Sequence, residues 1–260
     1  MGRPMATHLV NAGFTVNVYD VRDAAMESLV KAGVRAVASP QQVAERSEIV
    51  IVMVVDDQQA KDVVAGTRGL LEGAQVGTVI LLCSSLRPSI VRDLHAIAQP
   101  KGVDVVDAPG TGGERGAIEG KLTFLVGGSE SAYRRIGPVL QPLGQEVVHV
   151  GPAGAGQVAK TVHNVLLWAE LAATREALQF AARLGVGTDA VRRALASCPA
   201  NNWALADWED TDNIPWAGKD LSSAMTIAEE VGASMPVAAL VRELLKGWHR
   251  PELPGAPLAR

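Results

Sequence analysis

A lysine and an asparagine four residues apart, Lys160 and Asn164, follow a glycine-rich run at residues 151–156. Side chains four positions apart share one face of a helix, so both can reach the same bound molecule. A lysine amine can take a proton from an alcohol or return it, and an amide can hold an oxygen by hydrogen bonds. His163 points about 60° away from Lys160 and about 100° away from Asn164 around the helix. We therefore interpret His163 as a structural residue.

The surroundings of Lys160 decide which protonation state it favours. Val158, Val162 and Leu166 lie nearby in the sequence and predict a largely apolar setting. Desolvation favours the neutral amine and moves its pKa toward neutrality, which suits general acid/base catalysis. The alternative is a lysine that extends from an amphipathic helix into solvent. The preceding glycine-rich run favours the catalytic interpretation.

A second candidate group is Thr111, which is followed by Gly112 and Gly113. Glycine adopts backbone conformations that other residues avoid, so successive amides can turn toward an anion. With the threonine hydroxyl, they would suit the carboxylate of a small substrate. Taken alone, such a run is also typical of a plain turn.

The first 20 residues have the layout of the second half of a dinucleotide-binding βαβ unit. In the complete unit a strand precedes G-x-G-x-x-G, whose amides receive a pyrophosphate, and an acidic residue about 20 positions later binds the ribose hydroxyls. Gly2 corresponds to the third glycine and Asp20 to the acid, whereas the sequence lacks the first strand and the first two glycines. A plain surface helix at residues 1–6 is the alternative.

Asp20 bears on the choice between NAD and NADP. A carboxylate at this position repels a 2′-phosphate and so favours NAD. Arg22, two residues later, could offset this preference by pairing with the phosphate. The alternative is that Asp20 and Arg22 form a solvated surface pair.

Short β-branched runs alternate with helical patterns up to about residue 150 and predict the sheet that positions these groups. The expected strands are at residues 14–19, 49–55, 78–82, 103–106, 122–126 and 146–150, the last two extending the same sheet. Continuous apolar strands separated by helices predict a parallel sheet covered on both faces. The fold class is therefore α/β, a Rossmann-like sheet domain without its first strand, followed by an all-helical domain.

Beyond residue 150 the pattern becomes helical. An Ala- and Leu-rich stretch at residues 157–184 predicts one long helix, and further helices are expected at 188–196, 219–231 and 236–248, with a polar loop at 208–215 and a loose tail at 250–257. We predict a dinucleotide-binding domain over residues 1–150 and a helical substrate and dimerisation domain over residues 151–260. A helix apolar on most sides must be covered, so we expect a homo-oligomer, a dimer or tetramer.

Composition excludes several classes of protein. With 260 residues, 48% of them apolar and 20% charged, the chain is typical of globular proteins. Its net charge of -4 and scattered basic residues give no footprint for nucleic acid. Cys83 and Cys198 support neither a disulfide framework nor a metal site, so we expect a reducing, cytoplasmic compartment. No apolar run approaches the roughly 18 residues of a membrane span, so we expect no membrane partner.

Three segments, in order and at matching separations, resemble the 3-hydroxyisobutyrate dehydrogenase (β-hydroxyacid dehydrogenase) family over nearly the whole chain. Residues 107–113 resemble its D-A-P-V-S-G-G loop, with Thr111 in the serine position. Residues 151–164 resemble G-x-x-G-x-G-x-x-x-K-x-x-x-N, the most specific of the three. Residues 218–221 match a K-D-L motif that opens a helix.

This resemblance implies an NAD(P)-dependent oxidoreductase that transfers a hydride between the cofactor and a small 3-hydroxy acid, or the corresponding semialdehyde or keto acid. Lys160 is the implied acid/base and Asn164 holds the reacting oxygen, while Thr111, Gly112 and Gly113 bind the substrate carboxylate.

The resemblance also implies that Val55, Ser85 and Lys219 bind the cofactor together with Gly2 and Asp20, and that Asp220 helps hold the site. Val55 replaces the family's usual proline. Lys219 could equally be a solvated charge at a helix start. The segment at residues 203–219 is shorter than in the family, which predicts that part of the substrate pocket wall, or of a dimer contact, is missing or remodelled.

Two other functions are consistent with the sequence. Residues 112–116 and 160–164 also resemble 6-phosphogluconate dehydrogenase, although the helical domain of that enzyme is much longer and the sequence has no arginine cluster for a sugar phosphate. The other is a cofactor-free, catalytically inactive scaffold, because the absent strand and G-x-G should weaken both the sheet and the pyrophosphate loop.

Overall fold

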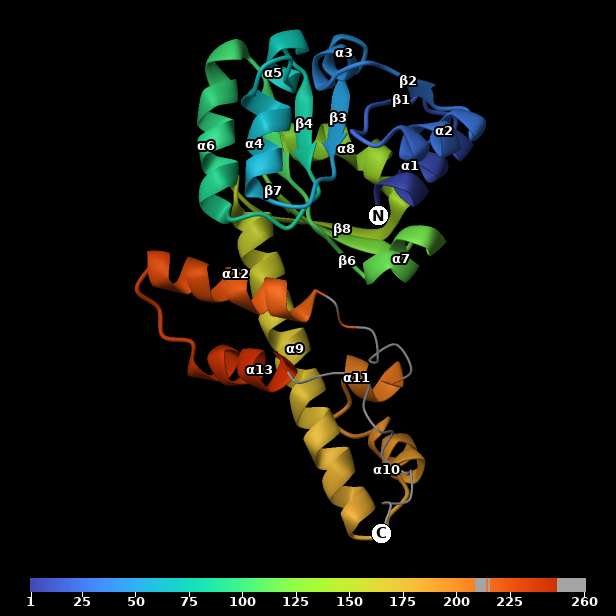
Figure 1. The fold of residues 1–260 in the computed structure, drawn as a ribbon, viewed down its shortest axis with the longest axis vertical. Helices are drawn as coiled ribbons and strands as arrows, with labels where there is room; N and C mark the ends of the chain where they lie inside the picture. The colour runs from blue at the N-terminus through green and yellow to red at the C-terminus, as the bar shows by residue number, and fades with distance from the viewer. Residues whose placement is uncertain (209–213, 215, 247–260) are drawn as a thin grey trace. The chain divides into compact units, whose positions relative to one another are not determined.

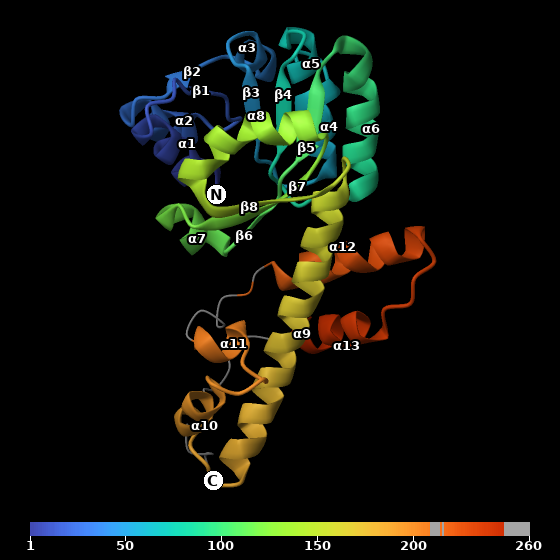
Figure 2. The ribbon, with the colours of Figure 1, turned by 180° about the vertical axis from the view of Figure 1, so that it is seen from behind.

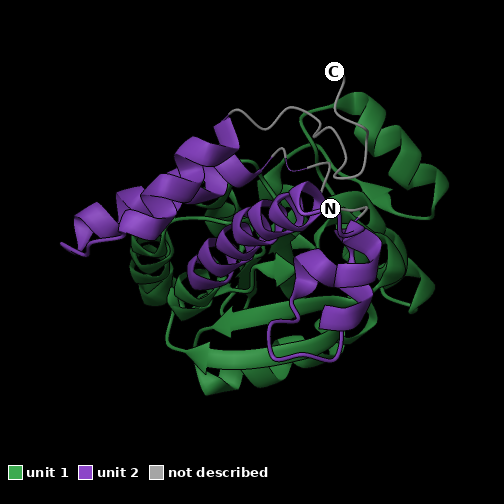
Figure 3. Ribbon diagram, turned by 90° about the horizontal axis from the view of Figure 1, so that it is seen from below, with its two compact units in different colours: residues 1–160 green, residues 161–260 purple. Residues whose placement is uncertain are grey.

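The computed structural model describes residues 1–208, 214 and 216–246. The chain divides into two compact units, Met1–Lys160 and Thr161–Arg260, coloured separately in Figure 3. The expected tail at residues 250–257, most of the expected loop at 208–215 and the end of the last expected helix lie outside the described residues.

In the first unit strands alternate with helices, as the sequence predicts (Figure 1). The elements are α1 (Gly2–Asn11), β1 (Asn17–Val18), α2 (Asp23–Lys31), β2 (Arg35–Ala36), α3 (Pro40–Glu45), β3 (Ile49–Val52), α4 (Asp57–Ala65), α5 (Leu70–Gly73), β4 (Val79–Leu82), α6 (Pro88–Ala98), η1 (Gln99–Lys101), β5 (Asp104–Asp107), β6 (Gly110–Thr111), α7 (Gly113–Glu119), β7 (Leu122–Gly127), α8 (Glu130–Leu140), η2 (Gln141–Leu143) and β8 (Gly144–Gly151). Helix α9 (Ala155–Arg183) then runs into the second unit.

The described strands form two sheets, which corrects the expectation of a single parallel sheet. β1 and β2 form a parallel pair, while the larger sheet has the order β3-β4-β5-β7-β6, with β8 paired to β7. β3, β4 and β5 are parallel, but β7 runs antiparallel to β5 and β6. The chain reverses between β5 and β7 through β6 and α7 instead of making a full crossover, so the larger sheet is mixed. β7 and β8 nevertheless extend this sheet, as expected.

Two expected strands are shorter in the structure. The strand expected at 14–19 is limited to Asn17–Val18, and the one expected at 49–55 ends at Val52. Beyond β3 the backbone of Val54 is hydrogen-bonded by the Ser84 side chain and no longer continues the ladder. Side-chain hydrogen bonds of this kind commonly end regular structure.

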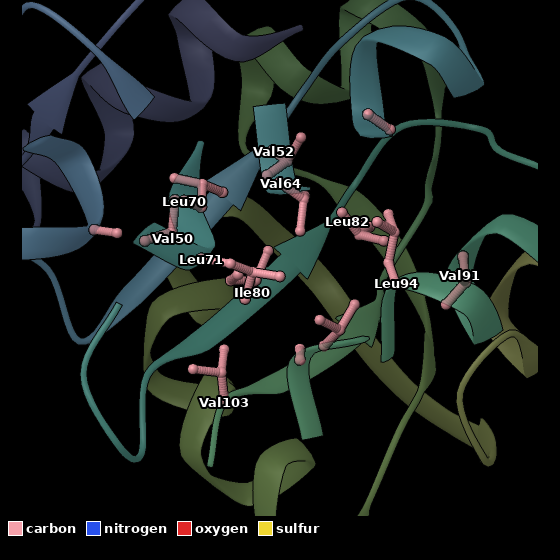
Figure 4. Close-up of a cluster of buried hydrophobic side chains, with 14 of the residues drawn as sticks. Val50, Val52, Val64, Leu70, Leu71, Ile80, Leu82, Val91, Leu94 and Val103 are labelled. Carbon is pink, nitrogen blue, oxygen red and sulfur yellow. The ribbon is translucent and has the colours of Figure 1, made fainter. Parts of the chain in front are cut away.

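Alternate residues of the central strands supply two separate cores. Val50, Val52, Ile80 and Leu82 pack in one cluster with residues of α4, α5 and α6 (Figure 4). Intervening residues such as Leu81 belong to the other cluster, with residues of α1 and α8. Figure 1 shows α4 and α6 in front of the sheet, and the reverse view in Figure 2 shows α8 in front. Both faces are therefore covered, and ligand-binding groups are confined to the strand ends.

The second unit is helical, as expected. After the Thr161–Arg183 part of α9 it contains α10 (Thr188–Leu195), α11 (Trp203–Ala206), α12 (Ala217–Glu230) and α13 (Pro236–Lys246). Trp168 and Leu171 of α9 pack with Leu221 of α12 and Val241 of α13. Searched over the described residues, no helix has the length and hydropathy needed to cross a membrane.

Candidate active site

The loops after β3 and β4 are joined by the side chain of Ser84. Its hydroxyl accepts a hydrogen bond from the Val54 amide at 2.7 Å and donates one to the Val54 carbonyl at 2.8 Å. Val55 and Ser85, the two cofactor residues expected at these strand ends, are the next residues along each loop, and both are exposed. The structure therefore brings these two loops together at the carboxyl ends of parallel strands.

Gln157, in the first turn of α9, also holds the loop after β4. Its Oε1 accepts a hydrogen bond from the Leu86 amide at 3.0 Å, and its Nε2 donates one to the Ser84 carbonyl at 2.8 Å. The Gln157 side chain is fully buried. Ser85 lies between the two peptide groups that this one carboxamide binds.

Asp107, at the end of β5, fixes the start of α9. Its Oδ1 accepts a hydrogen bond from the Gly154 amide and its Oδ2 one from the Gln157 amide, both at 2.7 Å. Burial raises the pKa of this carboxyl to about 6, against hydrogen bonds from the backbone amides of Gly154 and Gln157, which lower it. At neutral pH the carboxylate is thus ionised and caps the amides of the first turn.

Two glycines leave the space that Asp107 occupies. A Cβ on Gly127 would lie 2.5 Å from Asp107 Oδ1 and 2.7 Å from the Gly156 amide nitrogen. A Cβ on Gly156 would lie 2.9 Å from Asp107 Oδ2 and would collide with the Leu125 carbonyl oxygen. The glycine-rich run before Lys160 thus allows the strand ends and α9 to approach closely.

Lys160 and Asn164 both lie on α9 and share one face of it. The prediction that Val158 and Val162 surround Lys160 with apolar groups is wrong. Each is two positions from Lys160 and points about 160° away from it around the helix. Val158, Val162 and Leu166 are 47%, 54% and 57% exposed. Lys160 itself is partly buried, so its burial comes from other groups.

Asn164 is a buried polar residue on this face of α9. Its side chain is only 6% exposed. Within the part of the chain that the structure describes, its carboxamide makes no hydrogen bond to another protein group. A buried polar group without a partner costs about 1–3 kcal/mol, so such groups call for an explanation.

Thr111, Gly112 and Gly113 connect β6 to α7. Gly112 has φ +104° and Gly113 has φ +63°, values that side chains with a Cβ adopt only with strain. Thr111 is partly buried and pairs with Thr123 across the antiparallel strands β6 and β7. The backbone geometry therefore accounts for both glycines.

Gly2 and Asp20 lie at two further element ends. Gly2 begins α1, and a Cβ there would lie 3.7 Å from Met53, the residue after β3. Asp20 follows β1, and its carboxylate accepts hydrogen bonds from the Arg22 amide at 2.9 Å and the Arg22 Nε at 3.2 Å. Partial burial of Asp20 opposes ionisation, but the hydrogen bonds and charge of Arg22 outweigh it and lower the pKa of the carboxyl.

In the second unit, Lys219 lies exposed in the first turn of α12. Its neighbour Asp220 accepts a hydrogen bond from the indole Nε1 of Trp168 at 3.2 Å. Trp168 lies on α9, four residues after Asn164, so this contact ties α12 to the turn of α9 that follows the asparagine.

Comparison with known proteins accounts for both halves of the chain. Residues 1–151 match the model of the NAD binding domain of 6-phosphogluconate dehydrogenase, and residues 154–256 match the model described as NAD-binding of NADP-dependent 3-hydroxyisobutyrate dehydrogenase. A 3-hydroxyisobutyrate dehydrogenase of Pseudomonas aeruginosa is 34% identical, with 94% of this chain and 87% of that protein covered. The chain belongs to the 3-hydroxyisobutyrate dehydrogenase family. The resemblance drawn from the motifs is thereby confirmed.

A second relative and a solved structure are also similar to this chain over most of their length. The NAD-dependent L-serine dehydrogenase of Pseudomonas aeruginosa is 33% identical, with 95% of this chain and 88% of that enzyme covered. The structure of Mycobacterium tuberculosis 3-hydroxyisobutyrate dehydrogenase with L-serine superposes with a TM-score of 0.88 at 27% identity, covering 98% of this chain and 94% of that one. As a member of this family, the chain is a nicotinamide-dependent oxidoreductase with a Rossmann-type domain followed by a helical one.

The groups at the strand ends fit a nicotinamide dinucleotide. Gly2 lacks a side chain where α1 meets the end of β3, and the exposed loops of Val55 and Ser85 are held together beside it. Asp20 is ionised and partly exposed after β1, which suits hydrogen bonds from ribose hydroxyls.

Sequence reasoning missed three residues of the site. Ser84, Asp107 and Gln157 were within the segments considered, but no role was assigned to them. Their partners lie 30 to 73 residues away along the chain, so no local pattern identifies them. The one signal in the sequence was that these three residues are polar and stand at positions that the fold buries.

Proposed function

We propose that this chain transfers a hydride between a nicotinamide cofactor and a small 3-hydroxy acid, with Lys160 as general acid/base. The buried carboxamide of Asn164, one helical turn from Lys160 and without a hydrogen-bond partner among the described residues, is the observation that carries the proposal. A substrate hydroxyl or carbonyl oxygen would satisfy that carboxamide. The family's relatives named for L-serine and for 3-hydroxyisobutyrate support the substrate class, since both compounds carry a carboxylate and an alcohol two carbons away.

Lys160 and Asn164 divide the work at the reacting oxygen. Asn164 holds the oxygen, and the neutral Lys160 amine takes the hydroxyl proton in the oxidative direction. In the reductive direction the ammonium returns that proton to the carbonyl oxygen. The bound nicotinamide supplies the hydride acceptor or donor.

Thr111, Gly112 and Gly113 are our proposed binding groups for the substrate carboxylate. The positive φ angles of Gly112 and Gly113 aim successive amides differently from an extended chain, which supports an anion-binding turn. The Thr111 hydroxyl adds a donor beside them. A carboxylate held there would fix the distance from the acid group to the reacting alcohol, and hence select 3-hydroxy acids.

Gly2, Asp20, Val55, Ser85 and Lys219 are the proposed cofactor-binding residues. Asp20 would bind the ribose hydroxyls, which favours NAD over NADP. Arg22 pairs with Asp20 and leaves most of its own side chain exposed. This arrangement supports a preference for NAD that is moderate and not absolute.

We further propose a homo-oligomer that covers an exposed apolar stripe on α13. Val237, Leu240 and Leu244 lie three and four residues apart on that helix and are all exposed. Exposed apolar patches of this kind mark protein interfaces. Leu240→Glu should lower the molar mass measured by light scattering, whereas Val231→Glu, at an exposed valine outside the stripe, should not. A wild-type monomer would contradict the proposal.

A reducing compartment such as the cytoplasm is consistent with the two thiols. Cys83 and Cys198 are both free. Burial raises the pKa of the Cys83 thiol to about 12, so this cysteine is not a nucleophile at neutral pH.

The proposed reaction is tested by the absorbance of the reduced cofactor with a panel of acids. We expect turnover with 3-hydroxy acids and little with 2-hydroxy acids or with alcohols that lack a carboxylate. Lys160→Ala should remove nearly all turnover while the NAD(H)-induced thermal shift stays close to that of the wild type. Absence of both turnover and thermal shift in the wild type would favour the inactive scaffold instead.

A further inference from the structure

We propose that Gln157 is a positioning residue that holds the cofactor-side loop at Ser85 in register with the acid/base helix of Lys160. The inference rests on the proposed function for the reaction it affects. It concerns a side chain with no assigned role, placed between a proposed cofactor-binding residue and the proposed acid/base.

The contacts of Gln157 are specific to a carboxamide. Its oxygen accepts from the Leu86 amide at 3.0 Å and its nitrogen donates to the Ser84 carbonyl at 2.8 Å. A flipped carboxamide would set donor against donor and acceptor against acceptor. One buried planar group therefore fixes the backbone on both sides of Ser85.

The backbone of Gln157 is fixed as well. Its amide donates to Asp107 Oδ2 at 2.7 Å, and Lys160 follows three residues later on the same helix. Less than one turn of hydrogen-bonded helix thus separates the residue that holds Ser85 from the residue that moves the proton.

The connection extends one loop further. The Ser84 hydroxyl binds the amide and carbonyl of Val54, so a displacement of the β4 loop would reach the residue before Val55. Loss of the Gln157 contacts should therefore shift the cofactor-side loops relative to Lys160. Small displacements between reacting groups are costly, about 100-fold in rate for roughly 1 Å.

The first test compares Gln157→Leu with Tyr133→Phe. Tyr133 also makes a partly buried hydrogen bond, from its hydroxyl to the Val147 carbonyl at 3.0 Å, in the same unit but away from these loops. We expect kcat to fall about 10- to 100-fold in Gln157→Leu, with the KM for substrate changing much less. Tyr133→Phe should keep wild-type kcat within about twofold. Equal effects of the two variants on kcat would show a general loss of packing and overturn the proposal.

The second test uses Gln157→Glu. A neutral glutamic acid offers one donor and one acceptor, as glutamine does, whereas the carboxylate turns an acceptor toward the Ser84 carbonyl. The ratio of Gln157→Glu to wild-type kcat should therefore rise as the pH falls, while the ratio for Gln157→Leu stays flat. Asp107, the titratable group that binds the Gln157 amide, is present in wild type and in both variants. A flat ratio for Gln157→Glu would contradict the inference.

Amide hydrogen exchange separates this inference from the proposed reaction. A wild type without hydride transfer would refute the reaction, yet the exchange measurement still tests the coupling. Gln157→Leu should speed exchange in peptides containing Leu86 and Val54, whose amides are held directly and through Ser84. Unchanged exchange at both amides would refute the coupling itself.

Discussion

Replacing Asp107 by asparagine keeps the size of the side chain and removes one of two essential acceptors. In the wild type each carboxylate oxygen accepts one amide proton from the start of α9, those of Gly154 and Gln157. Asparagine has a single acceptor oxygen, so its NH2 group must face a backbone donor. We expect the first turn of α9 to loosen and turnover at pH 8 to fall by at least about tenfold, because Lys160 follows directly on that helix.

The effect of the same substitution on stability depends on pH. Burial raises the pKa of Asp107 from 3.8 to about 6. A group whose pKa is raised in the folded state contributes stability that is present below its unfolded pKa and is lost as the pH rises through the folded one. At 1.36 kcal/mol per pKa unit, and with the unfolded carboxyl already more than half ionised at pH 4, the loss between pH 4 and pH 7 is about 2 kcal/mol. Asparagine does not titrate, so the variant does not lose this stability as the pH rises.

Urea unfolding of both proteins at several pH values measures this difference. The free energy of unfolding of Asp107→Asn relative to wild type should rise by about 2 kcal/mol from pH 4 to pH 7. Wild-type kcat/KM should also decline below about pH 6, as Asp107 gains its proton, and this limb should vanish in the variant. Asp62→Asn, which removes an exposed carboxylate of the same unit, is the control and should show neither effect. Parallel stability curves, or wild-type turnover by Asp107→Asn at pH 8, would refute the reasoning.

Three further substitutions test separate parts of the site. Asn164→Leu should leave the free energy of unfolding unchanged or raise it by about 1 kcal/mol, because it removes a buried amide that has no partner among the described residues. Hydride transfer should fall by about 100-fold, and a variant that keeps its turnover would show that Asn164 is not part of the site. Asp20→Ser should raise the ratio of kcat/KM with NADP to that with NAD by at least about tenfold, or about 1.4 kcal/mol. An unchanged ratio would show that Asp20 does not bind the ribose hydroxyls. Gly127→Ala should destabilise the protein by about 3 kcal/mol in thermal or urea unfolding, because its Cβ would lie 2.5 Å from Asp107 Oδ1. Gly137→Ala, at a helical position with open space around it, should not destabilise the protein. Equal stability of the two variants would contradict the packing around Asp107.

Local patterns in the sequence were sufficient to predict the long helix and the unusual backbone of the glycines after Thr111. The long helix expected at residues 157–184 is α9, Ala155–Arg183, because a run of strong helix formers without turn residues has few other conformations. The two glycines after Thr111 were likewise expected to adopt unusual backbone angles, and both have positive φ. In each case the structure depends on residues that are close together in the sequence.

Strand pairing could not be predicted in the same way. The run at residues 122–126 indicates a strand but carries no information on direction, and β7 runs antiparallel to β5. The separation of β1 and β2 from the larger sheet is also a matter of pairing between distant segments. Hydrogen bonds between strands are set by the whole topology, which a local pattern does not contain.

The setting of Lys160 shows a different limit. Val158 and Val162 are close to it in sequence but lie on the opposite side of α9. The contacts that do organise its helix come from Asp107, 47 residues before Gly154 and 50 before Gln157. Proximity along the chain was mistaken for proximity in space, and the buried network from Ser84 to Asp107 remained undetected.

The role of Lys160 is tested most directly by single-turnover hydride transfer with Lys160→Ala, with and without added methylamine. Wild type and variant are mixed with saturating cofactor and a 3-hydroxy acid, and reduced cofactor is followed over time. We expect the variant to be slower by about 1,000-fold or more, and a free amine to restore part of the rate in proportion to its neutral form. A Lys160→Ala variant that transfers hydride within tenfold of the wild-type rate and does not respond to the amine would contradict the assignment.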